Sequence, residues 1–257
     1  MVNLNALAWL TDSLSRLRSL STFGAQEVDG ALRRALPGRC AFCLSAKSRE
    51  RPWCPACHES LPWNLPACPR CAEPQPGQLL GRPCGACLRL SPHFDRARVP
   101  LRYEAEVNAL VQRFKFHASP RAGAILLALL EEALPARAQV FPEALMAVPL
   151  HPARARERGF DQADWLTHRL ARRLGVPRII AHRLRDTRTQ RGLDREERRA
   201  NLRAAFAVPS RLPRRLALLD DVMTTGATLD ALAQACQRAG AEEIEVWAVA
   251  RTPLQAA

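Results

Sequence analysis

Short apolar runs alternate with amphipathic stretches along the C-terminal two thirds of the chain. The apolar runs are typical of buried strands and occur at 99–103, 145–149, 179–180, 216–219 and 244–250. Between them, 105–115, 122–134, 163–174 and the stretch after Thr228 to about residue 239 carry apolar residues at the i, i+3, i+4, i+7 spacing of helices. This alternation predicts an α/β fold with a mainly parallel sheet and helices on both of its faces.

The first third of the chain lacks this alternation. Residues 1–19 are weakly amphipathic, and we interpret them as a frayed or docked helix because they lack the basic start and long apolar core of a signal peptide. No apolar run approaches the roughly 20 residues that a membrane span needs. We therefore expect a cytoplasmic protein, with a peripheral place at the inner membrane as the alternative.

Cysteine spacing gives the clearest chemical signal in the first third. Eight of the nine cysteines form four Cys-x-x-Cys pairs, namely Cys40/Cys43, Cys54/Cys57, Cys68/Cys71 and Cys84/Cys87. Two thiolates in one tight turn can bind one ion, and two such turns complete a tetrahedral zinc site. The segments between the pairs are rich in proline, so metal must supply much of the folding free energy.

We predict two structural zinc ions, each bound by consecutive pairs because the loops are then shorter. The alternatives are one zinc ion with some free cysteines, an interleaved pairing of the turns, and disulfides. His58 could be a further ligand but is expected to be a bystander. Cys236, alone on a predicted helix, is interpreted as a small core residue.

A second signal follows the apolar run 216–219. The order there is Asp220, Asp221, Val222, Met223, Thr224, Thr225, Gly226, Ala227 and Thr228, and then a helix. Amides at a helix N-terminus bind phosphate, the threonines add hydroxyls, and Gly226 permits a close backbone approach. Carboxylates would repel a bare phosphate but suit sugar hydroxyls, alone or shared with Mg²⁺. The segment favours a sugar phosphate, and a buried strand before a merely capped helix is the alternative.

Two further positions could contact a pyrophosphate. Lys115 is one of only two lysines and ends a predicted helix, where a solvated helix terminus is the equal alternative. A basic loop follows the strand at 145–149, and within it Arg158 and Gly159 are the expected contacts. The polar segment 184–206 is either an exposed helix rich in arginine and glutamate or a lid over the phosphates.

The charge distribution keeps a nucleic-acid function open. The net charge is +13, and residues 151–215 contain 18 arginines and seven acidic residues, an excess of 11 positive charges. One interpretation is a surface that binds nucleic acid, with Trp53 and Trp63 available to stack on bases. The other is a set of solvated, arginine-rich helices.

The nine residues at 220–228 resemble the phosphoribosyl pyrophosphate signature of type I phosphoribosyltransferases. Together with the four cysteine pairs, Phe114-Lys115-Phe116 and Arg158-Gly159-Phe160-Asp161-Gln162, they make the chain similar to the ComF family of bacterial competence proteins. The family usually has Asn where Asp161 stands. We expect a helical segment at 1–37, a double zinc-ribbon domain at 38–91, and a phosphoribosyltransferase-like domain at 92–257 with a sheet of the type I phosphoribosyltransferase kind.

The resemblance implies that the chain binds phosphoribosyl pyrophosphate with Mg²⁺. Asp220 and Asp221 would be the catalytic carboxylates, and residues 222–228, Lys115, Arg158 and Gly159 would contact the ligand. It also implies a role in DNA uptake and natural transformation, with single-stranded DNA and a competence helicase or a DNA-processing protein as partners. The alternatives are an active phosphoribosyltransferase of unknown acceptor and a DNA-binding adaptor without catalysis. Purine salvage is disfavoured, because Thr224 stands where those enzymes place a carboxylate.

Overall fold

The computed structural model describes residues 38–46, 51–134, 141–150, 159–184 and 205–253. The predicted helical segment 1–37 and most of the polar segment 184–206 therefore lie outside the described residues. The chain divides into two compact units, Met1–Ser60 and Leu61–Ala257. In its described part, the first unit carries α2 (Pro55–Glu59) and the first two cysteine pairs. The second unit carries the sheet, its helices and the other two cysteine pairs.

A parallel sheet of six strands forms the centre of the second unit. Its order is β1-β8-β7-β3-β4, and β2 also pairs with β8. The strands are β1 (Arg96–Arg98), β2 (Leu101–Arg102), β3 (Ala144–Ala147), β4 (Arg178–Ile179), β7 (Arg215–Met223) and β8 (Glu243–Arg251). All of their pairings are parallel. The central strands β7 and β8 are largely buried, as a parallel sheet covered on both faces requires. The predicted α/β class and parallel sheet are confirmed.

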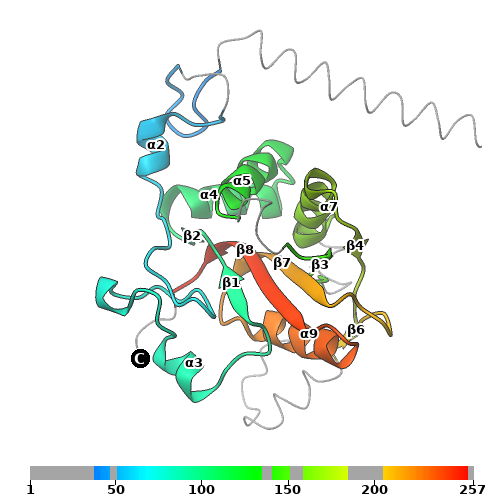
Figure 1. The fold of residues 1–257 in the computed structure, drawn as a ribbon. Helices are drawn as coiled ribbons and strands as arrows, with labels where there is room; N and C mark the ends of the chain where they lie inside the picture. The colour runs from blue at the N-terminus through cyan, green and yellow to red at the C-terminus, as the bar shows by residue number, and fades with distance from the viewer. Residues whose placement is uncertain (1–37, 47–50, 135–140, 151–158, 185–204, 254–257) are drawn as a thin grey trace, which may run out of the picture. The chain divides into compact units, whose positions relative to one another are not determined.

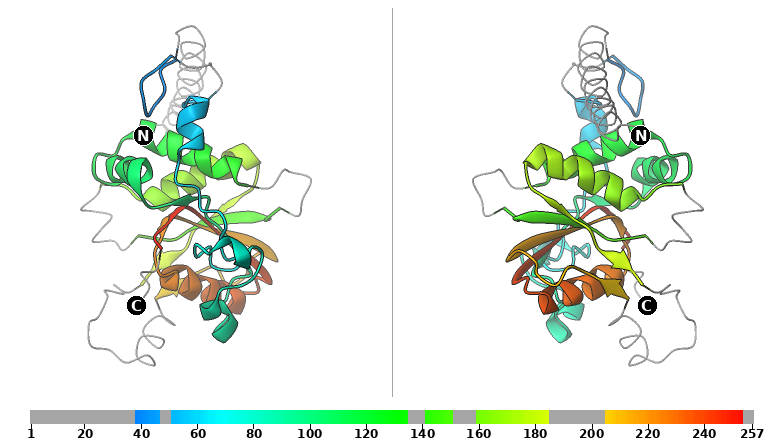
Figure 2. Two further views of the ribbon diagram at one scale, coloured as in Figure 1. Left: turned by 90° about the vertical axis from the view of Figure 1, so that its left-hand side faces the viewer. Right: turned by 90° about the vertical axis from the view of Figure 1, so that its right-hand side faces the viewer.

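Helices cover both faces of this sheet (Figures 1 and 2). The helices α4 (Ala105–Phe116), α5 (Pro120–Glu132) and α7 (Gln162–Leu174) lie on one face. The opposite face is covered by α9 (Ala227–Arg238), whose apolar side packs into a core with β7 and β8. Each helix begins and ends within a few residues of the range that its apolar spacing predicts.

Two strands differ from the apolar runs that predict them. β7 continues beyond Leu219 to Met223, because β8 supplies pairing partners for its last residues, including Ala248 opposite Asp220. Within the run at 99–103 only Leu101 and Arg102 form a strand, β2, and a further strand, β1, ends before the run at Arg98. Pro100 lies between them and has no N–H to donate to a sheet ladder.

Smaller elements complete the second unit. The strands β5 (His182–Arg183) and β6 (Phe206–Ala207) pair antiparallel in a separate two-stranded sheet that the sequence does not predict. A short 3₁₀ helix, η1 (Gly77–Leu79), and α3 (Gly85–Arg89) lie in the segment of the third and fourth cysteine pairs. Among the described residues, no helix has the length and apolar character needed to cross a membrane.

Candidate functional site

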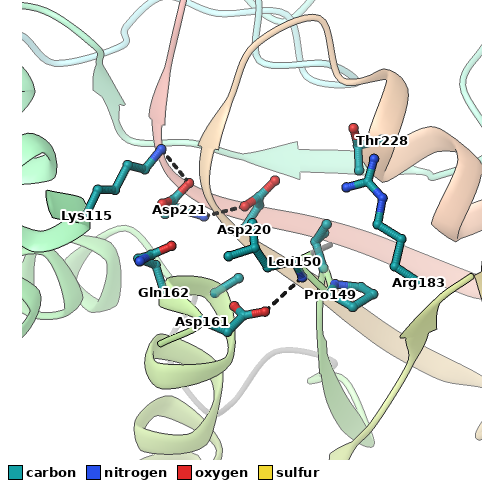
Figure 3. A pocket seen from close by; sticks show the side chains of 11 residues that line it. Lys115, Pro149, Leu150, Asp161, Gln162, Arg183, Asp220, Asp221 and Thr228 are labelled. Carbon is teal, nitrogen blue, oxygen red and sulfur yellow. Dashed lines mark hydrogen bonds and ion pairs between the residues drawn. The ribbon is translucent and has the colours of Figure 1, made fainter. Parts of the chain in front are cut away.

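A polar cavity of about 160 Å³ lies beside the C-terminal part of β7 (Figure 3). It is lined by residues from α4, the end of β3, α7, β5, β7 and α9, namely Lys115, Val148, Pro149, Leu150, Asp161, Gln162, Ala163, Arg183, Asp220, Asp221 and Thr228. The carboxyl ends of parallel strands meet at one edge of a sheet, so residues far apart in sequence come together there. Four of the predicted site residues, Lys115, Asp220, Asp221 and Thr228, line this cavity.

Lys115 and Asp221 form an ion pair in the cavity. The lysine Nζ lies 3.1 Å from Oδ1 of Asp221, and the two side chains are 17% and 10% exposed. Lys115 belongs to the last turn of α4 and reaches toward the carboxylates, as Figure 3 shows, so a solvated helix terminus does not describe it. The cavity therefore places one fixed ammonium group beside the carboxylates of the 220–228 motif.

The carboxylate of Asp220 is strongly perturbed by its surroundings. Its Oδ1 accepts a hydrogen bond from the amide of Asp221 at 2.8 Å. Burial and then the charge of Asp221 raise the pKa of Asp220 to about 8, although Lys115 and that hydrogen bond act in the opposite direction. Asp220 is thus mostly protonated at neutral pH, and a cation bound beside it would displace that proton.

The turn after β7 has the geometry of an anion-binding loop. Gly226 is the N-cap of the 12-residue helix α9 and has φ = 77°, and a Cβ there would lie 2.7 Å from Cε of Met223. Both features favour glycine. Thr224 and Thr225 are exposed, and Oγ1 of Thr225 accepts a hydrogen bond from the amide of Ala227 at 3.3 Å. The threonine hydroxyls are therefore accessible, and the positive end of the α9 dipole faces this turn.

The other predicted ligand contacts occupy different surroundings. Met223 is 1% exposed and Val222 is half-buried, so these two strand residues can offer a ligand little beyond their backbone. Gly159 is exposed with φ = 76°, and it is not among the residues that line the cavity. Arg158 lies outside the described residues.

Three polar residues of the cavity lie outside the predicted site, namely Asp161, Gln162 and Arg183. Asp161 is the N-cap of α7, and its carboxylate accepts hydrogen bonds from the amides of Asp164 at 2.9 Å and Leu150 at 2.8 Å. Burial raises the pKa of Asp161. An aspartate immediately before an apolar-periodic stretch is an N-cap signal that could have placed it. Arg183 carries no such local signal, because β5 alone brings it to the cavity.

Each group of four cysteines has the geometry of a zinc site. The Sγ atoms of Cys40, Cys43, Cys54 and Cys57 lie within 4.8 Å of one another, and so do those of Cys68, Cys71, Cys84 and Cys87. The distance from Cys43 Sγ to Cys54 Sγ is 3.8 Å, and that from Cys71 Sγ to Cys84 Sγ is 3.6 Å. A tetrahedron with Zn–S bonds of about 2.3 Å has edges of about 3.8 Å, so both groups fit structural zinc. Consecutive pairs share each site, as the loop lengths predict.

The side chains of Trp53 and Cys236 are both buried. Trp53 is 3% exposed and stacks on His58 with ring centroids 5.6 Å apart, so the predicted base-stacking role of Trp53 is wrong. Trp63 is half-buried. Cys236 is fully buried with its Sγ 3.7 Å from Sδ of Met146, and burial raises its pKa to about 12. It is an unreactive core residue, as expected.

Solved structures similar to this chain include several phosphoribosyltransferases. The APRTase from Giardia lamblia is 16% identical with a TM-score of 0.36, over 62% of this chain and 91% of that chain. The glutamine phosphoribosylpyrophosphate amidotransferase from B. subtilis is 16% identical with a TM-score of 0.38, over 54% of this chain and 30% of that chain.

Sequence comparison gives much stronger similarities. Residues 31–88 match the family model of the double zinc ribbon domain. The chain is 37% identical over 232 residues to competence protein F of Haemophilus influenzae, covering 86% of this chain and 94% of that protein. It is 33% identical over 224 residues to the DNA utilization protein YhgH of Escherichia coli K12, covering 84% and 91%. With similarity of this extent over nearly the whole length of both proteins, the chain belongs to the competence protein F family.

Proposed function

We propose that the second unit binds phosphoribosyl pyrophosphate with Mg²⁺ and that the protein acts in DNA uptake. The observation that carries the proposal is the joint placement of Asp220, Asp221 and Thr228 on one cavity, directly before and after the Gly226 turn. A sugar phosphate needs oxygen-rich contacts for its hydroxyls and amide or hydroxyl donors for its phosphate, and this strand, turn and helix supply both.

Each residue has a distinct part in this proposal. Asp220 and Asp221 face the ribose hydroxyls and the Mg²⁺ ion, for which carboxylate oxygens are preferred ligands. The amides and hydroxyls of 224–228 receive the 5′-phosphate at the start of α9. Lys115, now paired with Asp221, would contact the pyrophosphate if a bound metal compensated the charge of that carboxylate. Arg158 and Gly159 are further pyrophosphate contacts in this proposal.

The DNA-uptake part of the proposal is supported by the relatives, which are named as competence and DNA utilization proteins. Single-stranded DNA and a helicase or DNA-processing protein of the same pathway are the proposed partners. The ligand site then gives the protein a link to nucleotide metabolism, because phosphoribosyl pyrophosphate is a nucleotide precursor.

Calorimetric titration of the full chain with phosphoribosyl pyrophosphate and Mg²⁺ tests the ligand. The wild type should bind, and Asp220→Asn combined with Asp221→Asn should weaken binding by about 100-fold, because both oxygen ligands of the metal lose their charge. Asp230→Asn is the matched control, since this carboxylate lies on α9 but pairs with His93 outside the cavity lining. No heat in the wild type, or equal affinity in the double variant, contradicts the proposal.

The same protein can be tested for transfer. Release of pyrophosphate on adding a panel of nucleobases and amines would extend the site from a binding site to a phosphoribosyltransferase. A panel without turnover would leave binding as the function of the site.

A further inference from the structure

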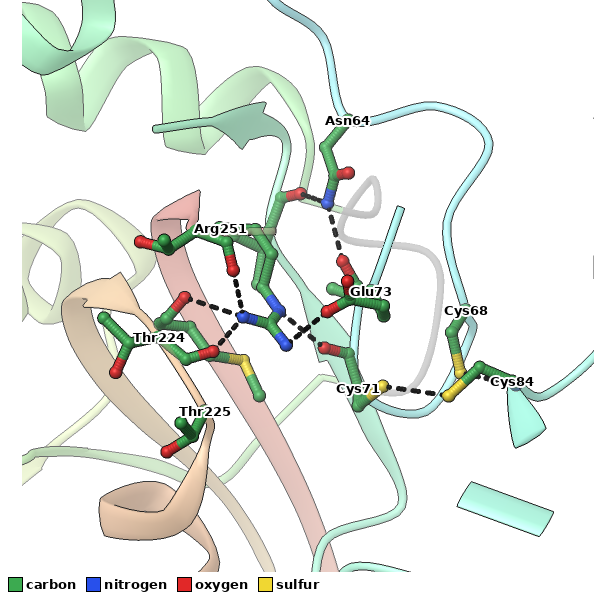
Figure 4. A network of polar contacts seen from close by, with 12 residues as sticks. Asn64, Cys68, Cys71, Glu73, Cys84, Thr224, Thr225 and Arg251 are labelled. Atoms are coloured by element: carbon green, nitrogen blue, oxygen red, sulfur yellow. Dashed lines mark hydrogen bonds and ion pairs between the residues drawn. The ribbon is translucent and has the colours of Figure 1, made fainter. Parts of the chain in front are cut away.

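A buried arginine lies between the 224–228 turn and the second cysteine cluster, which consists of Cys68, Cys71, Cys84 and Cys87 (Figure 4). Arg251 is the last residue of β8 and is 1% exposed. Its Nη1 donates to the carbonyl oxygens of Met223, at 3.2 Å, and Thr224. On the other side, Nε donates to the carbonyl oxygen of Cys71 at 3.3 Å, and Nη2 lies 2.6 Å from Oε2 of Glu73. One guanidinium group therefore joins two segments about 150 residues apart in sequence.

The hydrogen bonds from Arg251 to the 224–228 turn fix the direction of the amides in that turn. In a planar trans peptide the C=O and the following N–H point in opposite directions. When Arg251 holds the carbonyl oxygen of Thr224, the amide of Thr225 is directed away from Arg251. A turn binds an anion only if its N–H groups point toward the ligand, so the guanidinium holds the orientation that an anion site needs.

The contacts on the cysteine side belong to a turn that carries two metal ligands. The amide of Cys68 donates to the carbonyl oxygen of Glu73 at 2.8 Å, and the amide of Ala72 donates to that of Cys68 at 2.9 Å. Cys68 and Cys71 are thus in the same tight turn as both acceptors of Arg251. A metal ion that holds these two sulfurs also holds the carbonyl of Cys71 and the carboxylate of Glu73 in place.

We propose that Arg251 is a positioning residue through which the second zinc cluster (Cys68, Cys71, Cys84 and Cys87) sets the conformation of the 224–228 turn. Zinc in this cluster and a phosphate ligand at the turn then stabilise each other, and the effect is reciprocal because both act on one coupling free energy. The step from turn conformation to ligand affinity rests on the proposed function, whereas the step from Glu73 to the turn does not.

Hydrogen exchange of the ligand-free full chain tests the first step. Glu73→Gln keeps an acceptor of the same shape but removes the charge, so we expect the amides of 224–228 to exchange about tenfold faster with both zinc ions retained. Arg251→Lys should do the same, because a single ammonium group cannot reach the acceptors on both the turn side and the cysteine side. Glu143→Gln is the matched control, since Glu143 pairs with Arg215 at the opposite end of β7, at 2.9 Å. Unchanged exchange in a folded Glu73→Gln or Arg251→Lys variant overturns the proposal.

A wild-type measurement decides the question even if both variants fail to fold. In the full chain loaded with ¹¹³Cd, phosphoribosyl pyrophosphate with Mg²⁺ should shift the resonance of the second cluster, while the Cys40 cluster serves as the internal control. Calorimetric binding without that shift overturns the coupling. Absence of binding contradicts the proposed function instead. The coupling is then tested by removing the metal with a zinc chelator. Stripping the second cluster of wild type should speed exchange at 224–228, and unchanged exchange there also overturns the proposal.

Discussion

Asp220 illustrates how strongly burial and a neighbouring charge together can perturb a side chain. It lies in the strand before the turn, half-buried and adjacent to a second carboxylate, and its pKa is raised to about 8 by burial and by the charge of Asp221. A charge in such a place opposes folding unless a cation compensates it. The ionised form of Asp220 therefore lowers the stability of the folded state, a cost that is common at functional sites.

The pH dependence of stability tests this view of Asp220. Because the pKa is about 8 in the folded state and about 4 in the unfolded state, the folded state binds the extra proton between these values, and the free energy of unfolding falls as pH rises. Asp220→Asn removes the titrating group and therefore removes this fall in the free energy of unfolding. Relative to wild type, the variant should gain on the order of 2 kcal/mol between about pH 6 and about pH 8.5, measured by urea unfolding without Mg²⁺. A difference that is constant with pH contradicts the assignment.

Helices could be predicted from the sequence better than strands. The apolar spacing of α4, α5, α7 and α9 is local, so each range was close to the observed bounds. Strand pairing is non-local. β2 exists because Leu101 pairs with Ala250, and β7 extends to Met223 because β8 runs alongside. The antiparallel pair of β5 and β6 has only two residues in each strand, which is too short for a hydrophobic alternation in the sequence.

The same distinction applies to the site. Asp220, Asp221 and Thr228 belong to one contiguous motif, and the cysteine pairs have a diagnostic spacing, so both were accessible from the sequence. Lys115 could be named as a candidate, but its pairing with Asp221 depends on how α4 packs. Arg251 simply follows an apolar run, and its contacts arise only when the end of β8 meets both the second cysteine turn and the end of β7.

The N-terminus of α7 gives a prediction at the level of an element. Asp161 caps this helix through Oδ1, which accepts from the amide of Asp164, and holds the amide of Leu150 after β3 through Oδ2. Asp161→Ala should therefore cost about 2 kcal/mol of unfolding free energy. Asp161→Asn should cost about 1 kcal/mol, because its single amide oxygen keeps one of the two hydrogen bonds and its NH2 group cannot accept the other. Chemical denaturation of the two variants measures both values, and equal losses would contradict the capping role.

Charge is a property of the whole molecule, and α7 presents part of it on an exposed face. His168, Arg169, Arg172 and Arg173 are exposed along one side of this helix, and the guanidinium carbon of Arg169 lies 3.6 Å from the ring centroid of Trp165. Burial and then Arg173 and Arg172 lower the pKa of Arg169. Arg173 forms an ion pair with Glu131, and the positive charge of Arg169 and Arg172 beside it favours a polyanion at this face.

Binding of single-stranded DNA across a salt series tests this surface. Each phosphate contact releases a counterion and adds about 0.7 to the slope of log K against log salt concentration. Arg169→Gln combined with Arg172→Gln should therefore lower the slope by about 1.4 and weaken binding at low salt. The matched control removes two charges that already pair with glutamates, Arg96 with Glu245 and Arg214 with Glu242, and should change the slope less. If the slope falls equally in both double variants, the net charge of the protein rather than α7 attracts the DNA. If the affinity for DNA hardly depends on salt, phosphate contacts are not the basis of binding.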